Sequence, residues 1–444
     1  MAALPLSAHA SPASEVASAF DEGDKFDIHM SVDYQFEVRR ASIKREFSGF
    51  AGVMEGDPLP IAKDLLFKGT RHQLTPKLEL GLFRDISINV GLPIVIRDSR
   101  TLEFDQSDTP CVFPGGGGAA TCINADNSTT VRDGILPATG FDSDDPGGPG
   151  FTDPGDPTIF RSPTRAGLDQ VHLGLAWAAM NQARDDTKPT WKIGAEVRLA
   201  VGAVQRFDAD DPGSATGVSR GLHEVHLWTS MAKRMSFVEP RFRLWYIAPF
   251  AQRDNSLFVD YGFGQTSKDP QQRAGTEFGL EAVLWQDKAD QQRVALDVGA
   301  DLTAFFEGRA YTEMWEVFAL AGRAEANGPL VLDSDPETAG VQQASYPGVT
   351  NVENHMRFGS QVGVTAELGP HVRLGLGFRL VFDQQHLITF ADAGKDGPDS
   401  GDLVDPNSDE VNPGYVEIID LVGRRYRLED AVNYVGQVSA RVLF

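Results

Sequence analysis

Hydrophobic and polar residues alternate strictly over long stretches of this chain. In the last eleven residues, Tyr434 to Phe444, one face carries only uncharged residues and the other is more polar. The segment from Phe26 to Val38 alternates in the same way over seven apolar positions. A period of two puts successive side chains on opposite faces of a β-strand, whereas a helix would scatter these apolar residues around its axis. The pattern therefore predicts strands.

Twelve segments share this alternation, and several follow one another closely enough to be joined by tight turns, such as the one at Arg84-Asp85. The predicted strands cover residues 26–38, 74–82, 86–96, 171–179, 191–203, 225–231, 238–248, 278–284, 294–306, 356–366, 372–382 and 434–444.

The connections between these strands alternate between short and long. Short turns follow strands 2, 4, 6, 8 and 10, and long polar segments follow the odd-numbered strands at residues 39–73, 98–167, 205–221, 251–275, 308–352 and 388–429. An even number of strands with every long loop at one end is typical of transmembrane β-barrels, and soluble sandwiches have less regular connections. The expected fold class is therefore all-β, a single 12-stranded antiparallel transmembrane β-barrel spanning residues 25–444. Residues 1–24 are then a flexible leader or the remnant of a signal peptide.

The charges support an inside-out barrel. The uncharged stripe of each predicted strand contains no charged residue, and nearly all strand charges fall on the opposite stripe. In a soluble barrel the apolar stripe would face inward and form a core. Twelve strands enclose more space than apolar side chains comfortably fill, so a polar interior and a lipid-facing apolar surface fit better. A large soluble β protein is the alternative.

The last strand resembles the closing strand of Gram-negative outer-membrane barrels, which ends on an aromatic residue, here Phe444. The sequence Gly-Leu-Phe-Arg-Asp-Ile-Ser at residues 81–87 resembles the short periplasmic turns of a broad class of outer-membrane transport barrels. The resemblance covers nearly the whole chain but is one of architecture. It implies an integral outer-membrane protein with periplasmic termini and extracellular loops. The implied partners are the lipid bilayer, lipopolysaccharide and the barrel-assembly machinery, which would recognise Phe444.

Composition excludes several other classes. No run approaches 18 consecutive apolar residues, so the 444-residue chain has no helical membrane span. The formal charge of −23 argues against nucleic acid, which binds basic surfaces. Met1 to Ala10 offers only a short apolar run before Ser-Ala-His-Ala. That is too little for a signal peptide, so we expect the true start to lie upstream; the alternative is that the protein is not exported.

The two cysteines, Cys111 and Cys122, lie in one polar loop. No further ligands for a zinc site accompany them, so a local disulfide between these two cysteines, in an oxidising compartment, is expected. Closing so short a loop contributes at most about 3 kcal/mol.

The predicted inner face carries both signs of charge. Two interpretations stay open: the charges set the selectivity of a hydrated pore, or they pair across strands and reinforce the wall. Inward glycines such as Gly279 and Gly359 reduce side-chain bulk and favour an open bore of about 10 Å. The predicted pore-lining residues are Asp33, Glu37, Lys77, Glu79, Glu196, Arg198, Arg241, Arg243, Glu281, Asp297, Asp301, Arg357, Arg373, Arg379 and Arg441.

One helix is predicted, from Tyr311 to Arg323 in the fifth long loop. Met314, Trp315 and Phe318 form an apolar stripe at three- and four-residue spacing. The helix could fold into the barrel mouth and constrict it, or pack on the outer ends of neighbouring loops.

Aspartates crowd the long loops among Gly and Pro. Calcium takes six to eight oxygens from such clusters, but none matches an EF-hand, and solvated acidic loops are the more frequent explanation. An acidic rim would also enrich cations at the mouth. The candidate calcium ligands are Asp142, Asp144, Asp145, Asp208, Asp210 and Asp211.

Catalytic signals are weak. His29 and Ser31 share the predicted interior face, and His386 could face outward at the upper rim but has no serine that must lie beside it. There is no His-Glu-x-x-His metal motif and no phosphate-binding glycine loop, so no catalytic residue and no cofactor apart from calcium is expected. The expected function is passive passage of small polar solutes or ions. A structural or surface-recognition barrel and a lipid hydrolase are the alternatives.

Overall fold

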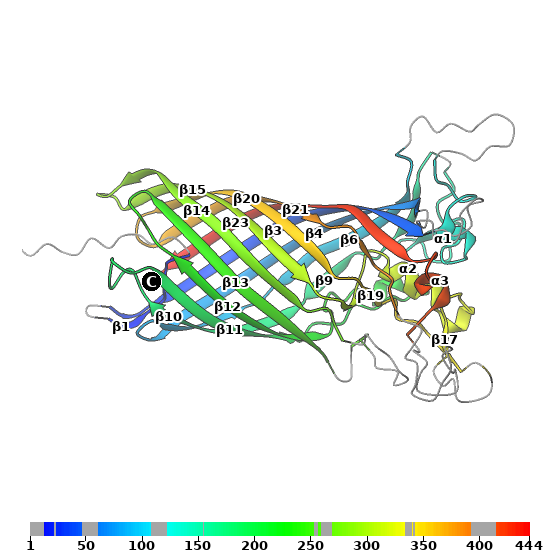
Figure 1. Cartoon of the computed structure of the whole chain (residues 1–444), viewed down its shortest axis with the longest axis horizontal. Coiled ribbons are helices and arrows are strands. Elements are labelled where there is room, and N and C mark those ends of the chain that lie inside the picture. The colour runs from blue at the N-terminus through cyan, green and yellow to red at the C-terminus, as the bar shows by residue number, and fades with distance from the viewer. Residues whose placement is uncertain are drawn as a thin grey trace, which may run out of the picture.

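Twelve long antiparallel strands close into one barrel in the computed structural model, which Figure 1 shows with the barrel axis horizontal. The structure describes residues 13–21, 24–46, 61–107, 122–153, 155–252, 256–258, 269–333, 340, 342–391 and 414–444. The C-terminus and the short turns lie at one end of the barrel, and the helices lie at the other. We call these the short-turn end and the long-loop end.

The predicted strand order is confirmed, and each strand pairs with its neighbours along the chain. The barrel strands are β3 (Ile28–Glu46), β4 (Ile61–Phe83), β5 (Ile86–Gly91) continued by β6 (Ile94–Phe104), β10 (Gln170–Met180), β11 (Thr190–Ala200), β12 (Leu222–Ala232), β13 (Val238–Ala251), β14 (Arg273–Asp287), β15 (Gln292–Phe305), β20 (His355–Leu368), β21 (Val372–Asp383) and β23 (Tyr426–Leu443).

The last strand closes the barrel on the first. β23 pairs with β3 from Tyr426 opposite Arg45 to Leu443 opposite His29, with one irregularity between Glu429 and Val432. Because Phe444 also exchanges backbone hydrogen bonds with Ile28, the chain end itself belongs to this closure.

The third strand is interrupted at Leu92-Pro93, which separates β5 from β6. Proline has no N–H to donate to a ladder, so a break there is expected. β5 pairs with β10 over six consecutive residue pairs, from Trp177 opposite Ile86 to His172 opposite Gly91. Beyond the break, β6 pairs irregularly with two short strands, β8 (Thr158–Arg161) and β9 (Arg165–Leu168).

The outer surface of the barrel is apolar. Leu376 is 66% exposed, Phe278 56% and Val438 52%, and these residues belong to the uncharged stripes of their strands. Similar large side chains are exposed along most of the other barrel strands. A continuous apolar surface of this kind is stable against hydrocarbon rather than water. The inside-out arrangement predicted from the sequence is confirmed.

Four barrel strands extend eight or more residues beyond their predicted ranges, into segments expected to be loops. The long-loop ends of β3, β4, β6 and β23 carry buried apolar side chains that pack together with the loops above them. We call this group the cap cluster; it includes Ile43, Leu65, Leu102, Phe318 and Tyr426. The cluster explains the extra length, because the extended strands bury one face beyond the lipid-facing part of the barrel.

Short elements make up the rest of the described loops. They are β1 (Ala19–Asp21), β2 (Asp24–Phe26), α1 (Thr129–Arg132), β7 (Phe141–Asp142), η1 (Pro212–Ser214), β16 (Gly308–Ala310), α2 (Trp315–Ala321), η2 (Ala324–Ala326), β17 (Leu332–Asp333), β18 (Gln343–Ala344), β19 (Thr350–Val352), β22 (His386–Leu387) and α3 (Glu417–Asp420). Within the described ranges, no helix has the length and apolar character needed to cross a membrane.

Candidate functional site

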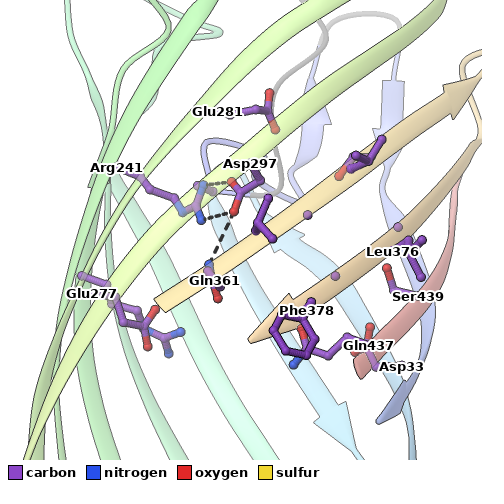
Figure 2. Close-up of a pocket in the computed structure, with 18 of the residues that line it drawn as sticks. Asp33, Arg241, Glu277, Glu281, Asp297, Gln361, Leu376, Phe378, Gln437 and Ser439 are labelled. Carbon is purple, nitrogen blue, oxygen red and sulfur yellow. Dashed lines mark hydrogen bonds and ion pairs between the residues drawn. The ribbon is translucent and has the colours of Figure 1, made fainter. Parts of the chain in front are cut away.

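The barrel interior holds two adjoining cavities of about 550 and 520 Å³. They share Asp33, Lys77 and Arg243 among their lining residues, so they form one space along the axis. Figure 2 shows part of the first cavity, with charged and amide side chains from β13, β15 and β20 pointing into it. All the predicted pore-lining residues line one of the cavities of the interior except Arg198, Asp301 and Arg379, which form ion pairs.

Interior charges pair across strands in a repeated manner. The Arg241 guanidinium on β13 reaches past β14 to Asp297 on β15, with 2.7 Å between Nη2 and Oδ1 (Figure 2). Gly279 lies on β14 between them, where an added Cβ would stand 2.4 Å from the Arg241 guanidinium carbon. Arg379 on β21 likewise reaches Asp301 on β15, 2.6 Å away. The missing side chain on the middle strand lets each pair form across three strands.

Other interior glycines are covered by indole rings. An added Cβ at Gly194 would lie 2.3 Å from the Trp228 ring, and one at Gly275 would lie 2.3 Å from the Trp245 ring. The expectation that inward glycines leave open space is therefore wrong at Gly194. A glycine in a strand leaves its backbone uncovered, and the flat ring of a neighbouring tryptophan fills the space where a side chain would stand.

A buried ionic network lies near the short-turn end. Arg293 donates to Glu281 and to Glu367, with nitrogen-to-oxygen distances of 3.0 and 2.7 Å, and Arg373 adds a 2.9 Å contact to Glu367. Arg293, Glu281 and Glu367 are each at most 4% exposed. Charges buried this deeply must be paired, so this network reinforces the wall where Glu281 and Arg373 border the two large cavities.

The N-terminal segment 13–21 lies inside the short-turn end of the barrel, where a flexible leader was expected. Ala13 and Val16 line the two large cavities. The Glu15 carboxylate pairs with Arg373 at 3.0 Å and with Arg441 at 2.8 Å, and the Glu15 carbonyl accepts a hydrogen bond from Lys192. The residues that follow Glu15 are small and pack closely inside the barrel: Ala17 is fully buried and Ala19 is 2% exposed. No periodic pattern marks this segment in the sequence, so sequence reasoning missed Glu15.

The fifth long loop crosses the long-loop end of the interior. Tyr311, Thr312 and Glu313 line two cavities of about 170 and 210 Å³, one on each side of this segment. Glu313 accepts a hydrogen bond from Arg39, which also reaches Asp383; both nitrogen-to-oxygen distances are 2.7 Å. Burial alone would raise the pKa of Glu313, but the Arg39 guanidinium lowers it below the usual range.

The predicted constriction helix is shorter than expected, and its apolar side packs into the cap cluster. α2 covers Trp315–Ala321 rather than Tyr311–Arg323, since Gly322 forms its C-cap. Met314 and Phe318 are fully buried in the cap cluster. Trp315 packs edge-on against Tyr311 and beneath the Arg165 guanidinium. The polar residues just before the helix, and not its apolar stripe, therefore lie against the interior.

The acidic loop residues form ion pairs and turns. Asp142 and Asp144 both pair with Arg161, Asp210 pairs with Arg323, and Asp208 accepts from backbone N–H groups of its own turn. Asp145 accepts a backbone hydrogen bond through its carbonyl, and Asp211 precedes η1. In the part of the chain that the structure describes, no three potential ligand side chains gather around a common point for a metal. Calcium binding stays a prediction.

The remaining predicted residues are placed as follows. Cys122 is buried, and Cys111 lies outside the described residues, so the disulfide stays a prediction. Phe444 is 59% exposed at the short-turn end. His29 and Ser31 line the same interior cavity. His386 does not face outward: it is 5% exposed and stacks on His355, with 3.6 Å between the ring centroids.

No family model matches the sequence, and no curated protein matches it. Among solved structures, the COG4313 outer membrane channel from Pseudomonas putida F1 is similar with a TM-score of 0.40 and 8% identity, over 98% of this chain and 100% of that chain. The β domain of the Bordetella autotransporter BrkA has a TM-score of 0.33 and 10% identity, over 93% and 99% of the two chains. The outer membrane protease OmpT from Escherichia coli has a TM-score of 0.29 and 7% identity, over 94% and 97%.

The fold assignment rests on the chain itself: on strands that close into a ring, on an apolar outer surface and on an ionic interior. These features together make the protein a transmembrane β-barrel, the architecture that the outer-membrane proteins of Gram-negative bacteria have.

Proposed function

We propose that the barrel is a channel for passive diffusion of small polar solutes or ions across the outer membrane. The long loops are extracellular and the termini periplasmic in this proposal, and lipid and lipopolysaccharide surround the apolar surface. The observation that supports it best is the pair of adjoining interior cavities, which together measure about 1,070 Å³ (550 plus 520) and are lined by charged and amide groups. A purely structural barrel would have no need for so much polar space.

The pairing of interior charges bears on selectivity. Most interior guanidinium groups face a carboxylate within hydrogen-bond distance, so the lumen would present balanced dipoles rather than one sign of charge. Lys77 differs from these residues, because its side chain is 52% exposed although it lies 3.0 Å from Asp33. A charge that solvent can reach in a narrow lumen acts on passing ions more strongly than a buried pair does.

Planar-bilayer recording of the purified full chain tests the proposal. We expect steady single channels, and we expect Lys77→Glu to shift the reversal potential in a salt gradient toward cations. Lys188→Glu makes the same charge change on a short turn, where Lys188 pairs with Asp185, and should leave the reversal potential unchanged. A folded, heat-modifiable barrel that never conducts would contradict the proposal.

A surface-recognition barrel is the second candidate, and the cap cluster favours it. Loops that only surround a pore need no apolar core, yet here four extended strands and α2 bury one together. A folded cap of this kind could present a fixed surface to a partner. Deleting residues 324–333, which follow α2, would leave conductance intact under the channel proposal and abolish partner or surface binding under the second.

A further inference from the structure

A small cavity at the long-loop end is surrounded by an excess of positive charge. It measures about 170 Å³ and lies between the barrel strands and the segment Gly308–Glu313. Five of its lining residues are arginines and two are acids, Glu313 and Asp383, a difference of three charges (5 minus 2). The cavity belongs to the region above the two large cavities and shares no lining residue with them.

The nearby carboxylates are shared between several of these arginines. Asp383 accepts from both Arg39 and Arg357, at 2.7 and 2.9 Å. Glu224, behind the cavity wall, accepts from both Arg220 and Arg273. Asp383 therefore balances two guanidinium groups, and Glu224 balances three because it also pairs with Arg198, so positive charge is in excess around the cavity.

Three buried donors facing this cavity have no acceptor. The Thr312 hydroxyl, the Gln271 amide nitrogen and the Arg273 Nε are all buried and make no hydrogen bond with any described residue. All three residues line the cavity, and Thr312 is only 7% exposed. Buried polar groups are almost always satisfied in folded proteins, so three orphaned donors around one cavity indicate a missing acceptor.

Ring walls and the size of the cavity limit what fits. Phe258 and Tyr311 pack edge-to-face with 5.7 Å between ring centroids, and Phe305 stacks on His355 at 4.6 Å. A cavity of about 150 Å³ can hold a molecule the size of benzene. The occupant must therefore be small, and its charged end must face the guanidinium groups and the orphaned donors.

We propose that this cavity is a binding site for a small oxyanion, a carboxylate or a phosphate, held by Thr312, Gln271 and Arg273. Oxyanion oxygens accept several hydrogen bonds at once and match the planar fork of a guanidinium. Halides offer no such directed set of acceptors. The segment Gly308–Glu313 forms one wall of the site. A bound oxyanion would therefore hold this segment in place across the barrel interior. The proposal holds whether or not the barrel conducts.

Isothermal titration of the purified full chain in detergent tests the site. Sodium phosphate and sodium propionate are titrated separately at constant ionic strength, with sodium chloride as the reference. Saturable binding of either oxyanion, without saturation by chloride, supports the proposal, and the oxyanion that binds identifies the ligand class. Absence of saturable binding by both would overturn it.

Two variants locate the binding in this cavity. Thr312→Val removes a hydroxyl that has no partner, so the unliganded fold should be as stable as before, and oxyanion affinity should fall about tenfold. Arg273→Gln should lower affinity at least as much. Arg323→Gln, which removes a charge from a loop ion pair with Asp210, is the control and should bind normally. Unchanged affinity in Thr312→Val and Arg273→Gln would place the binding elsewhere and overturn the proposal.

Discussion

The Glu15 carboxylate lies 2.8 Å from the Arg441 guanidinium, inside the barrel, although the two residues stand near opposite ends of the chain. Arg373 contacts the same carboxylate at 3.0 Å. One acidic side chain therefore holds the N-terminal segment against the last two barrel strands, β21 and β23.

Glu15→Gln should release this segment. The variant keeps the side-chain shape but loses two ion pairs, so the segment should leave the lumen about tenfold more often. Under the channel proposal, single-channel recordings should show a larger or longer-lived open state. Glu325→Gln changes an exposed loop acid and is the control. Identical recordings from the two variants would contradict the role of Glu15.

Gly194→Ala should destabilise the barrel, because the new methyl group would meet the Trp228 indole at 2.3 Å. Overpacking of this kind typically costs about 1–3 kcal/mol. Gly436→Ala is the matched control, since its added Cβ meets nothing closer than 4.0 Å and should change stability by under about 0.5 kcal/mol. Urea unfolding in lipid vesicles measures both. Equal midpoints for the two variants would show that Trp228 does not occupy the glycine's space.

Arg165→Met should unfold the loop around α2. Arg165 is fully buried, pairs with Glu316 at 2.7 Å and donates to the carbonyls of Ala215, Gly217 and Arg206. Its removal leaves a buried carboxylate without its partner, which costs about 3–5 kcal/mol.

Hydrogen exchange of the α2 backbone measures the effect of Arg165→Met. Arg161→Gln removes two more exposed ion pairs, with Asp142 and Asp144, in which the arginine side chain is 39% exposed, and should cost under about 1 kcal/mol. Slow exchange of α2 in Arg165→Met would exclude the expected role.

Asp420 should make the cap sensitive to pH. Burial raises its pKa to about 7, although it accepts backbone hydrogen bonds from Ala391 and Val416. Because the folded-state pKa of Asp420 is raised, the fold is stabilised when the Asp420 carboxyl is protonated. This stabilisation is fully present below about pH 4 and is lost as the pH rises through about 7.

Backbone exchange around α3 should therefore be at least about tenfold faster at pH 8 than at pH 4, after correction for intrinsic exchange. In Asp420→Asn the side chain is neutral at every pH, so most of that dependence should disappear. A pH dependence that Asp420→Asn leaves intact would assign the effect to another group.

The sequence predicts the barrel well because lipid imposes one rule on every strand. Val438 and Leu376 must be apolar to face hydrocarbon, so alternation appears wherever a strand crosses the membrane. Beyond the membrane this rule no longer applies. Arg45 and Asp64 look like polar loop residues in the sequence, yet both are buried, and Asp64 accepts hydrogen bonds from Ser128, Thr129 and Thr130. Partners so distant in sequence leave no local signal, so the extended strands and the cap were not predicted.

The interior was predicted in part for a related reason. The inward stripe identifies which charged residues face the lumen, but not which residues reach across a glycine to one another. Arg241 and Asp297 are separated by a whole strand, and their contact depends on the register that sets Gly279 between them. Glu15 and Glu313 come from irregular segments, and only the folded chain brings them to the interior.

The break at Pro93 leaves one strand-to-strand contact of the barrel wall shorter than its neighbour. Strands separate most easily where the fewest ladder hydrogen bonds must break together. β10 is joined to β11 by ten pairs but to β5 by six before the interruption. We therefore expect opening fluctuations of the barrel wall to be most frequent between β5 and β10, and a sideways opening toward the lipid to begin there.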